Sequence, residues 1–281
     1  MSRPNAAQVE FWGGDPGRRW VTHHADLDHL HRGVAELVLE TAELTPGMRV
    51  ADIGCGGGAL TLAAADRVGA GGEVLGLDIS ATLLKLAEET RREAGTANAR
   101  FVEADAQTYA FDDAFDRVIS RFGVMFFDDF DAGFANLRAA LAPGGRLVAA
   151  TWAPAEHNPW FSDARRVAVE RLGAPPAGDP DAPGPMALRD PERIDVIFKR
   201  AGFGDIEILQ RDITLTHPEG WTAMERLLPA IGPIPSVLRD RNGSDADLAA
   251  ILATLRAEWQ PYLATGPLNL PGRINLVTVT R

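Results

Sequence analysis

The feature that most constrains the fold is an alternation of short apolar segments with longer helical patterns between residues 48 and 152. The short segments have the length and composition of buried strands, and they lie at 48–53, 73–78, 99–105, 115–120 and 145–152. Helix-like segments lie between them and end at glycine, as helices often do. Strand–helix–strand units at this spacing form parallel sheets with helices on both faces. We therefore predict a doubly wound α/β fold.

The alternation breaks after Trp152, and this break predicts how the chain is organised. Two segments do not fit the core pattern: one contains a proline-rich loop, and the other holds two helical patches around the sequence GPIP. We expect these two segments to fold together as a cap. The predicted units are an N-terminal helical segment or lid (1–47), the first half of the core (48–152), a cap insertion (153–189), a core helix and strand (190–216), a second cap insertion (217–272) and a terminal core strand (273–281).

A glycine-rich turn, VADIGCGGGAL at 50–60, joins the first predicted strand to the helix that follows it. The backbone N–H groups of such a turn and the helix N-terminus can contact a ligand directly. Gly54, Gly56 and Ala59 match the G-x-G-x-x-A pattern of dinucleotide-binding folds, so an NAD(P)-dependent oxidoreductase is one interpretation. Asp52 favours another, because its carboxylate would repel a pyrophosphate and attract a ligand ammonium group.

Two further aspartates end the second and third predicted strands. Asp78 is placed to accept hydrogen bonds from ribose hydroxyls, and Asp105 from an adenine amino group. The carboxyl ends of adjacent parallel strands meet at one edge of a sheet, so the three carboxylates are expected along one crevice. An amino acid, a ribose and an adenine in that order are the parts of S-adenosylmethionine.

Five spaced motifs resemble those of class I S-adenosylmethionine-dependent methyltransferases, in particular the branch with ubiquinone/menaquinone-biosynthesis-type and natural-product small-molecule enzymes. The motifs are VADIGCGGG, VLGLDIS, VEADAQ, FDRVISRFGVMFF and LRAALAPGGRLVAATW. The resemblance implies a Rossmann-like sheet of seven strands, mostly parallel with an antiparallel last strand. It also implies that S-adenosylmethionine lies across the carboxyl ends of the first four strands.

The same resemblance implies a set of cofactor-binding residues. Asp52 and Gly54 would face the methionine part, with Cys55 and Gly56 completing the turn. Asp78 would hold the ribose, Ile79 would pack on the adenine, and Asp105 and Ala106 would contact the adenine edge. Ser120 and Arg121 would lie beside the methyl donor, and Trp20 belongs to a segment (11–20) that resembles the part closing over the cofactor in this branch.

The acceptor is expected to be a small, partly apolar molecule methylated on O, N or C. The expected substrate contacts are Trp12, His24, Phe122, Trp152 and Trp160, and Phe161 and Trp221 offer further aromatic wall. His157 follows the fifth strand and is the candidate general base, although alignment and desolvation carry most of the rate of methyl transfer. A protein that binds S-adenosylmethionine without methylating remains an alternative.

Composition limits the partners. The net charge of −11 argues against a nucleic-acid partner and against an anionic membrane surface. No stretch reaches the roughly 18 apolar residues of a spanning helix, and the start of the sequence lacks the apolar core of a signal peptide. Cys55 is the only cysteine, which excludes an internal disulfide, and no metal site is expected. We predict a cytoplasmic protein and leave a homodimer open.

Overall fold

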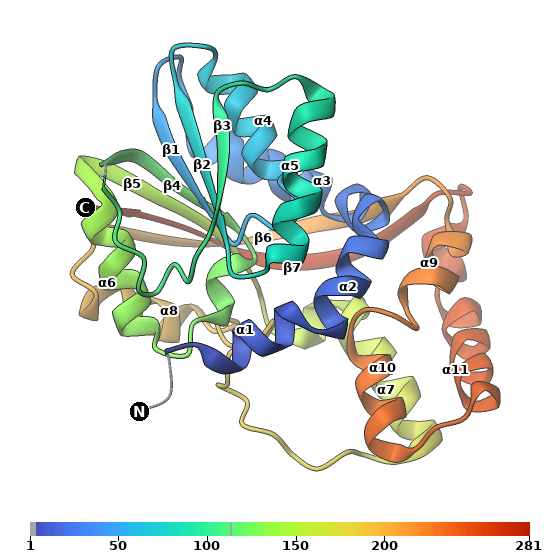
Figure 1. Ribbon diagram of the computed structural model, residues 1–281. Coiled ribbons are helices and arrows are strands. Elements are labelled where there is room, and N and C mark those ends of the chain that lie inside the picture. Colours follow the sequence, from blue (N-terminus) through green and yellow to red (C-terminus); the bar gives the residue numbers. More distant parts are fainter. Residues whose placement is uncertain (1–3, 113) are drawn as a thin grey trace.

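Seven strands form one mixed sheet in a computed structural model that describes residues 4–112 and 114–281 (Figure 1). Their order is β3-β2-β1-β4-β5-β7-β6; neighbours among β1 to β5 are parallel, and β7 runs antiparallel to β5 and β6. The strands are β1 (Arg49–Ile53), β2 (Glu73–Asp78), β3 (Ala99–Glu103), β4 (Phe115–Arg121), β5 (Leu141–Trp152), β6 (Gly204–His217) and β7 (Leu268–Thr280). The predicted fold class is confirmed.

The strand order reverses between β1 and β4, and this reversal distributes the helices. Successive strands run outward from β1 to β3 and then in the opposite direction from β4 to β5, and right-handed crossovers therefore put the two sets of helices on opposite faces. On one face lie α3 (His24–Thr41), α4 (Ala59–Val68) and α5 (Ala81–Ala94); on the other lie α6 (Phe130–Ala140) and α8 (Pro191–Arg200), which pack on each other. A crevice is expected where the carboxyl ends of β1 and β4 lie side by side.

Some elements differ from the sequence-based expectations. β7 begins at Leu268, five residues earlier than predicted, and pairs with β6 along its whole length. Residues 217–272 hold three α-helices, not two: α9 (Trp221–Leu227), α10 (Pro233–Arg241) and α11 (Asp245–Glu258), followed by the short helix η3 (Gln260–Leu263). GPIP opens α10 and does not separate two helices, because the first turn of a helix tolerates proline.

The two segments that do not fit the core pattern lie side by side (Figure 1). From the first, α7 (Pro159–Leu172) packs against α10 and α11 of the second. The indole Nε1 of Trp259 donates to Asp163 on α7 at 3.0 Å, and Arg171 pairs with Asp247 at 2.7 Å. Helices whose contacting residues are 76 and 96 positions apart in the sequence therefore form one packed group, which we call the cap.

Two short helices, α1 (Ala6–Gly13) and α2 (Asp15–Thr22), precede α3. Figure 1 shows them crossing below the carboxyl ends of β1 to β3, and α2 packs against α5. We call residues 4–22 the N-terminal segment; residues 1–3 of the predicted lid lie outside the described part of the chain. No helix within the described ranges is both long and apolar enough to cross a lipid bilayer.

Candidate functional site

The glycine-rich turn after β1 has a backbone that only glycine adopts easily. Gly54, Gly56 and Gly58 have φ values of 67°, 55° and 85°. A Cβ atom on Gly54 would lie 2.6 Å from the Cα of Gly123, which follows β4 and opens the short helix η1 (Gly123–Phe126). The two glycines therefore let the ends of β1 and β4 approach closely, whereas space within 4 Å of a Cβ on Gly56 is open.

Asp52 lies near the end of β1 and is 1% exposed. Its Oδ2 accepts a 2.6 Å hydrogen bond from the hydroxyl of Thr61, but its buried Oδ1 has no partner among the residues that the structure describes. Burial raises the pKa of this carboxyl group to about 7, partly offset by the Thr61 hydrogen bond. A cationic group beside Oδ1 would satisfy this atom and lower the pKa.

Asp78 ends β2 and holds the glycine-rich turn in place. Its Oδ2 accepts from the Gly56 N–H at 2.8 Å, and its Oδ1 accepts from the Ser80 N–H at 2.9 Å. Burial raises the pKa of Asp78, while these N–H groups act in the opposite direction. Each carboxylate oxygen can accept a further hydrogen bond, so the side chain can join the turn to ligand hydroxyls.

Asp105 follows β3 and is contacted by the N-terminal segment. Its Oδ1 accepts from the Gln107 N–H at 3.0 Å and from the Asn5 side-chain amide at 3.2 Å. Its Oδ2 is buried and has no partner in the described ranges. The backbone N–H of Asn5 also donates to Asp128 at 2.7 Å, so two acidic side chains hold the start of the N-terminal segment. Asn5 was not among the residues predicted from the sequence.

The residues at the end of β4 are engaged within the protein. The Ser120 hydroxyl donates to the carbonyl of Ile53 at 2.8 Å and accepts from the N–H groups of Gly123 and Val124 at 3.1 and 3.3 Å. These three hydrogen bonds use the full capacity of a hydroxyl, which makes Ser120 a tie between β1 and η1. Arg121 pairs with Asp28 of α3 at 3.0 Å.

The remaining predicted cofactor residues lie along the same edge of the sheet. The backbone N–H of Cys55 donates to Leu77 on β2 at 2.9 Å, and its thiol is buried. Burial raises the pKa of this thiol well above its ordinary range, which makes it an unreactive small side chain. Ile79 is half-buried after β2, and the buried Ala106 follows Asp105.

Aromatic side chains gather beside this edge. We define the aromatic cluster as Trp12, Trp20, His31, Phe122, Phe126, Trp152 and Phe161. Phe122 stacks on Trp152 with ring centroids 4.3 Å apart, and Trp152 meets Phe161 of α7 edge-on at 5.2 Å. Trp12 and Trp20 of the N-terminal segment contact each other, and the ring centroids of Trp12 and Phe126 are 5.2 Å apart. The cluster therefore joins the N-terminal segment, the ends of β4 and β5, and the cap.

His31 is the titratable residue within the cluster, and it was not among the site residues predicted from the sequence. Its ring lies 5.4 Å from Phe122, 5.9 Å from Trp152 and 6.4 Å from Trp20. Burial and, to a smaller extent, Arg121 lower its pKa to about 3, so the imidazole is neutral near pH 7. The periodicity could have identified it, because it shares the buried face of α3 with Leu27, Leu30 and Val34.

Several predicted acceptor contacts lie elsewhere. The ring of His24 contacts the carbonyl of Val21 at 2.8 Å at the start of α3. His157, on the short helix η2 (Ala155–His157), is exposed. The pKa of Asp212 on the edge strand β6 is lowered mainly by its hydrogen bond from Arg273, with His157 making only the smallest contribution. Trp160 is buried beside Gly232 at the start of α10. Ring contacts link Trp12, Phe122 and Trp152 through the aromatic cluster. Among the residues that the structure describes, no ring contact links His24, His157 or Trp160 to it.

Trp221, a further predicted aromatic wall residue, belongs to the cap. Its indole Nε1 donates to Glu225 at 2.8 Å, and its ring meets Trp259 edge-on at 6.3 Å. These contacts make it part of the packing between α9 and α11.

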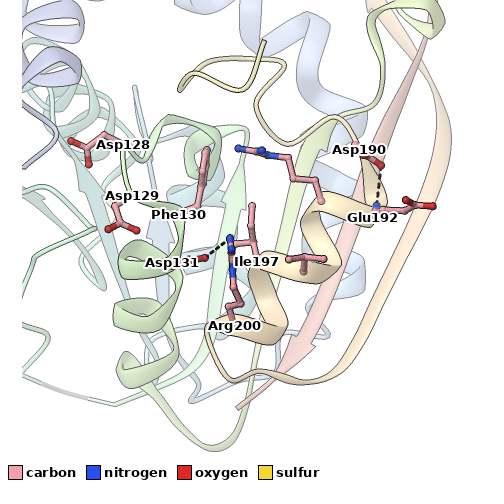
Figure 2. A pocket seen from close by; sticks show the side chains of 10 residues that line it. Asp128, Asp129, Phe130, Asp131, Asp190, Glu192, Ile197 and Arg200 are labelled. Carbon is pink, nitrogen blue, oxygen red and sulfur yellow. Dashed lines mark hydrogen bonds and ion pairs between the residues drawn. The ribbon is translucent and has the colours of Figure 1, made fainter. Parts of the chain in front are cut away.

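A hollow of about 600 Å³ lies between α6 and α8 (Figure 2). Its wall carries acidic side chains from the starts of both helices, and several are already engaged: Asp131 pairs with Arg200 at 3.0 Å, and Asp190 accepts from the Glu192 N–H at 3.0 Å. None of the three strand-end carboxylates lines it. The hollow therefore does not include the carboxylates at the ends of β1, β2 and β3, although Asp128 in its wall accepts the backbone N–H of Asn5.

Comparison with known proteins places the chain in context. A sequence profile described as a methyltransferase domain matches residues 50–145. Nocamycin O-methyltransferase from Saccharothrix syringae is 32% identical over 207 residues, which cover 68% of this chain and 73% of that protein. The ubiquinone/menaquinone biosynthesis C-methyltransferase UbiE of Shewanella piezotolerans is 34% identical over 131 residues, covering 46% of this chain and 52% of that protein. The chain thus spans about half the length of this second relative.

A solved structure agrees at the level of the fold. The YcgJ protein of Bacillus subtilis superposes with a TM-score of 0.56 and 19% identity, covering 89% of this chain and 99% of that one. At this identity the likeness concerns the architecture alone.

Proposed function

Since the chain belongs to the family of S-adenosylmethionine-dependent methyltransferases, we propose that it methylates an oxygen or a carbon atom of a small, partly apolar acceptor carrying an acidic enol or phenol. The relatives support both acceptor atoms, because one is named an O-methyltransferase and another a C-methyltransferase. An enolate offers either atom as the nucleophile.

The crevice residues fit the cofactor. Three buried carboxylates stand at or just beyond the ends of β1, β2 and β3, and two of them have an oxygen without a partner in the described part of the chain. We assign Asp52 to the ammonium group, Asp78 to the ribose hydroxyls and Asp105 to the adenine amino group. The cofactor supplies a methyl group activated on a sulfonium. The bare backbone of the glycine-rich turn lets a ligand approach without meeting side chains.

The aromatic cluster is the observation that carries the acceptor class. Phe122 directly precedes Gly123, whose backbone approaches Gly54 in the turn, so the cluster begins next to the proposed cofactor crevice. Its members are apolar or neutral at pH 7 and come from the N-terminal segment, α3, the ends of β4 and β5, η1 and the cap. Such a wall suits a planar or apolar acceptor and excludes water, which strengthens the alignment of the nucleophile with the methyl group.

The low pKa of His31 bears on whether the acceptor needs a general base. A pKa of about 3 means that the ring cannot hold a transferred proton near neutral pH, although it can hydrogen-bond to an acceptor. The predicted base His157 is exposed, and no ring contact in the described ranges links it to Phe161 or Trp152, which pack in the cluster. An acceptor that ionises by itself therefore fits the site better than an aliphatic alcohol, which needs a strong base.

The test is a labelled-methyl transfer assay with three matched acceptor sets: phenols and enols, aliphatic alcohols, and amines. We expect label in the first set, at a rate that rises with the ionised fraction of the acceptor and is unchanged in His157→Ala. Label confined to amines, or lost in His157→Ala, would contradict the proposal. Tight cofactor binding without transfer to any set or to a metabolite extract would favour a non-methylating protein.

We further propose that the protein acts in the cytoplasm and on a small molecule, with no nucleic acid partner. The net charge of −11 supports the absence of a nucleic-acid partner. Assays with added RNA and DNA test it directly, and cell fractionation tests the location. A homodimer stays a prediction that light scattering can check.

A further inference from the structure

We propose that Asn5 of the N-terminal segment reads the adenine base of the cofactor, its side-chain carbonyl accepting a hydrogen bond from the 6-amino group next to Asp105. This inference rests on the proposed assignment of Asp105 to the adenine. It adds to that assignment a residue one hundred positions earlier in the sequence. The N-terminal segment would then select the base as well as cover it.

Asn5 is held in one position although it lies near the start of the chain. It is 4% exposed and has a φ of 56°, a left-handed conformation that asparagine tolerates better than most residues. Its backbone N–H donates to Asp128 at 2.7 Å, and its carbonyl accepts from the N–H groups of Gln8 and Val9 at 3.0 and 3.1 Å. Its side chain is therefore aimed by backbone contacts on both sides.

The contact with Asp105 determines which end of the Asn5 amide faces a ligand. The carboxylate of Asp105 accepts hydrogen bonds, so the amide nitrogen of Asn5 must point toward it, at 3.2 Å from Oδ1. The amide oxygen of Asn5 then points elsewhere. It is buried, and residues 4–112 and 114–281 provide no partner for it.

Two buried acceptors without partners therefore lie on touching side chains, Oδ1 of Asn5 and Oδ2 of Asp105. Buried acceptors in native proteins are nearly always satisfied, so their joint presence points to a ligand with donors. The 6-amino group of adenine has two N–H donors, which is the number required. A 6-oxo purine would instead present an oxygen to two acceptors.

The experiment measures the dissociation constants of S-adenosylhomocysteine and S-inosylhomocysteine by calorimetry. Wild type, Asn5→Gly and Glu10→Ala are compared. Glycine accepts the left-handed backbone while removing the amide, and Glu10 is an exposed residue of α1, the helix that Asn5 precedes. In Asn5→Gly we expect about tenfold weaker binding of the adenine ligand, from one lost buried hydrogen bond, and little loss for the hypoxanthine ligand. Glu10→Ala should behave as wild type.

The ratio of the two dissociation constants is the deciding quantity. Equal losses for both ligands in Asn5→Gly, however large, would mean that Asn5 only latches the segment and would overturn the inference. Failure of wild type to bind S-adenosylhomocysteine would instead refute the proposed cofactor site itself. Melting curves without ligand show whether Asn5→Gly retains the fold. We expect only a small shift, because glycine keeps the backbone N–H and carbonyl contacts of position 5.

Discussion

The substitution Asp52→Asn should weaken cofactor binding and stabilise the ligand-free protein. The amide keeps the shape of the carboxylate and can still accept the Thr61 hydrogen bond at its oxygen. The variant loses the negative charge that, in our proposal, binds the ammonium group of the cofactor. A hydrogen bond between charged groups contributes about 1.5–3 kcal/mol, so affinity should fall about 10- to 150-fold.

The stability effect follows from the pKa of Asp52. Burial raises it from 3.8 to about 7, and this difference corresponds to at most about 4 kcal/mol that the native state loses when the carboxylate ionises. The native state binds the proton more tightly than the unfolded chain, so wild-type stability falls as pH rises from about 4 to about 7 and then levels off. The amide does not ionise, and Asp52→Asn should therefore be the more stable protein at pH 8.

Denaturant unfolding at pH 5 and pH 8 measures this difference, and calorimetry with S-adenosylhomocysteine measures the affinity. In wild type the affinity should rise between pH 5 and pH 7, because bound ammonium favours the ionised carboxylate and binding releases a proton. Asp66→Asn, on the exposed side of α4, is the matched control. A variant that is less stable at pH 8 and binds the ligand as wild type does would refute the reasoning.

Three further predictions concern neighbouring parts of the site. Asp78→Ala should weaken cofactor binding about tenfold or more in calorimetry, because it removes the ribose acceptor and frees the Gly56 N–H from the turn. Gly123→Ala should lower the free energy of unfolding by roughly 1–3 kcal/mol, and with it the melting temperature, because its methyl group would collide with the carbonyl of Ile53; an unchanged melting curve would be inconsistent with this contact. Wild-type stability should fall as pH falls from 6.5 toward about 3, because the unfolded chain binds a proton at His31 in this range and the buried imidazole stays neutral. His31→Phe should reduce this loss. Acid unfolding curves of equal shape for the two proteins would argue against it.

Local features of the sequence account for much of the fold and for where the strand-end carboxylates lie. Strand length, helix periodicity and glycine at helix ends are set by neighbouring residues, and they sufficed to predict β1 to β5 within a few residues at most ends. Parallel pairing then brings the ends of β1, β2 and β3 to one edge, so Asp52, Asp78 and Asp105 could be expected there together. The start of α10 was missed because proline suits both a loop and a first helical turn.

Long-range packing decided the rest, because a periodic pattern says which face of an element is buried but not what it meets. The sequence alone indicated the bare turn at Gly54, and only the tertiary structure showed that Gly123 packs against it. Likewise, the buried face of α3 is visible in its spacing, yet the neutral state of His31 depends on its burial beside Trp20, Phe122 and Trp152. Asn5 lies a hundred residues from Asp105, and no local pattern marks their contact; it exists because the N-terminal segment folds across the carboxyl ends of the strands.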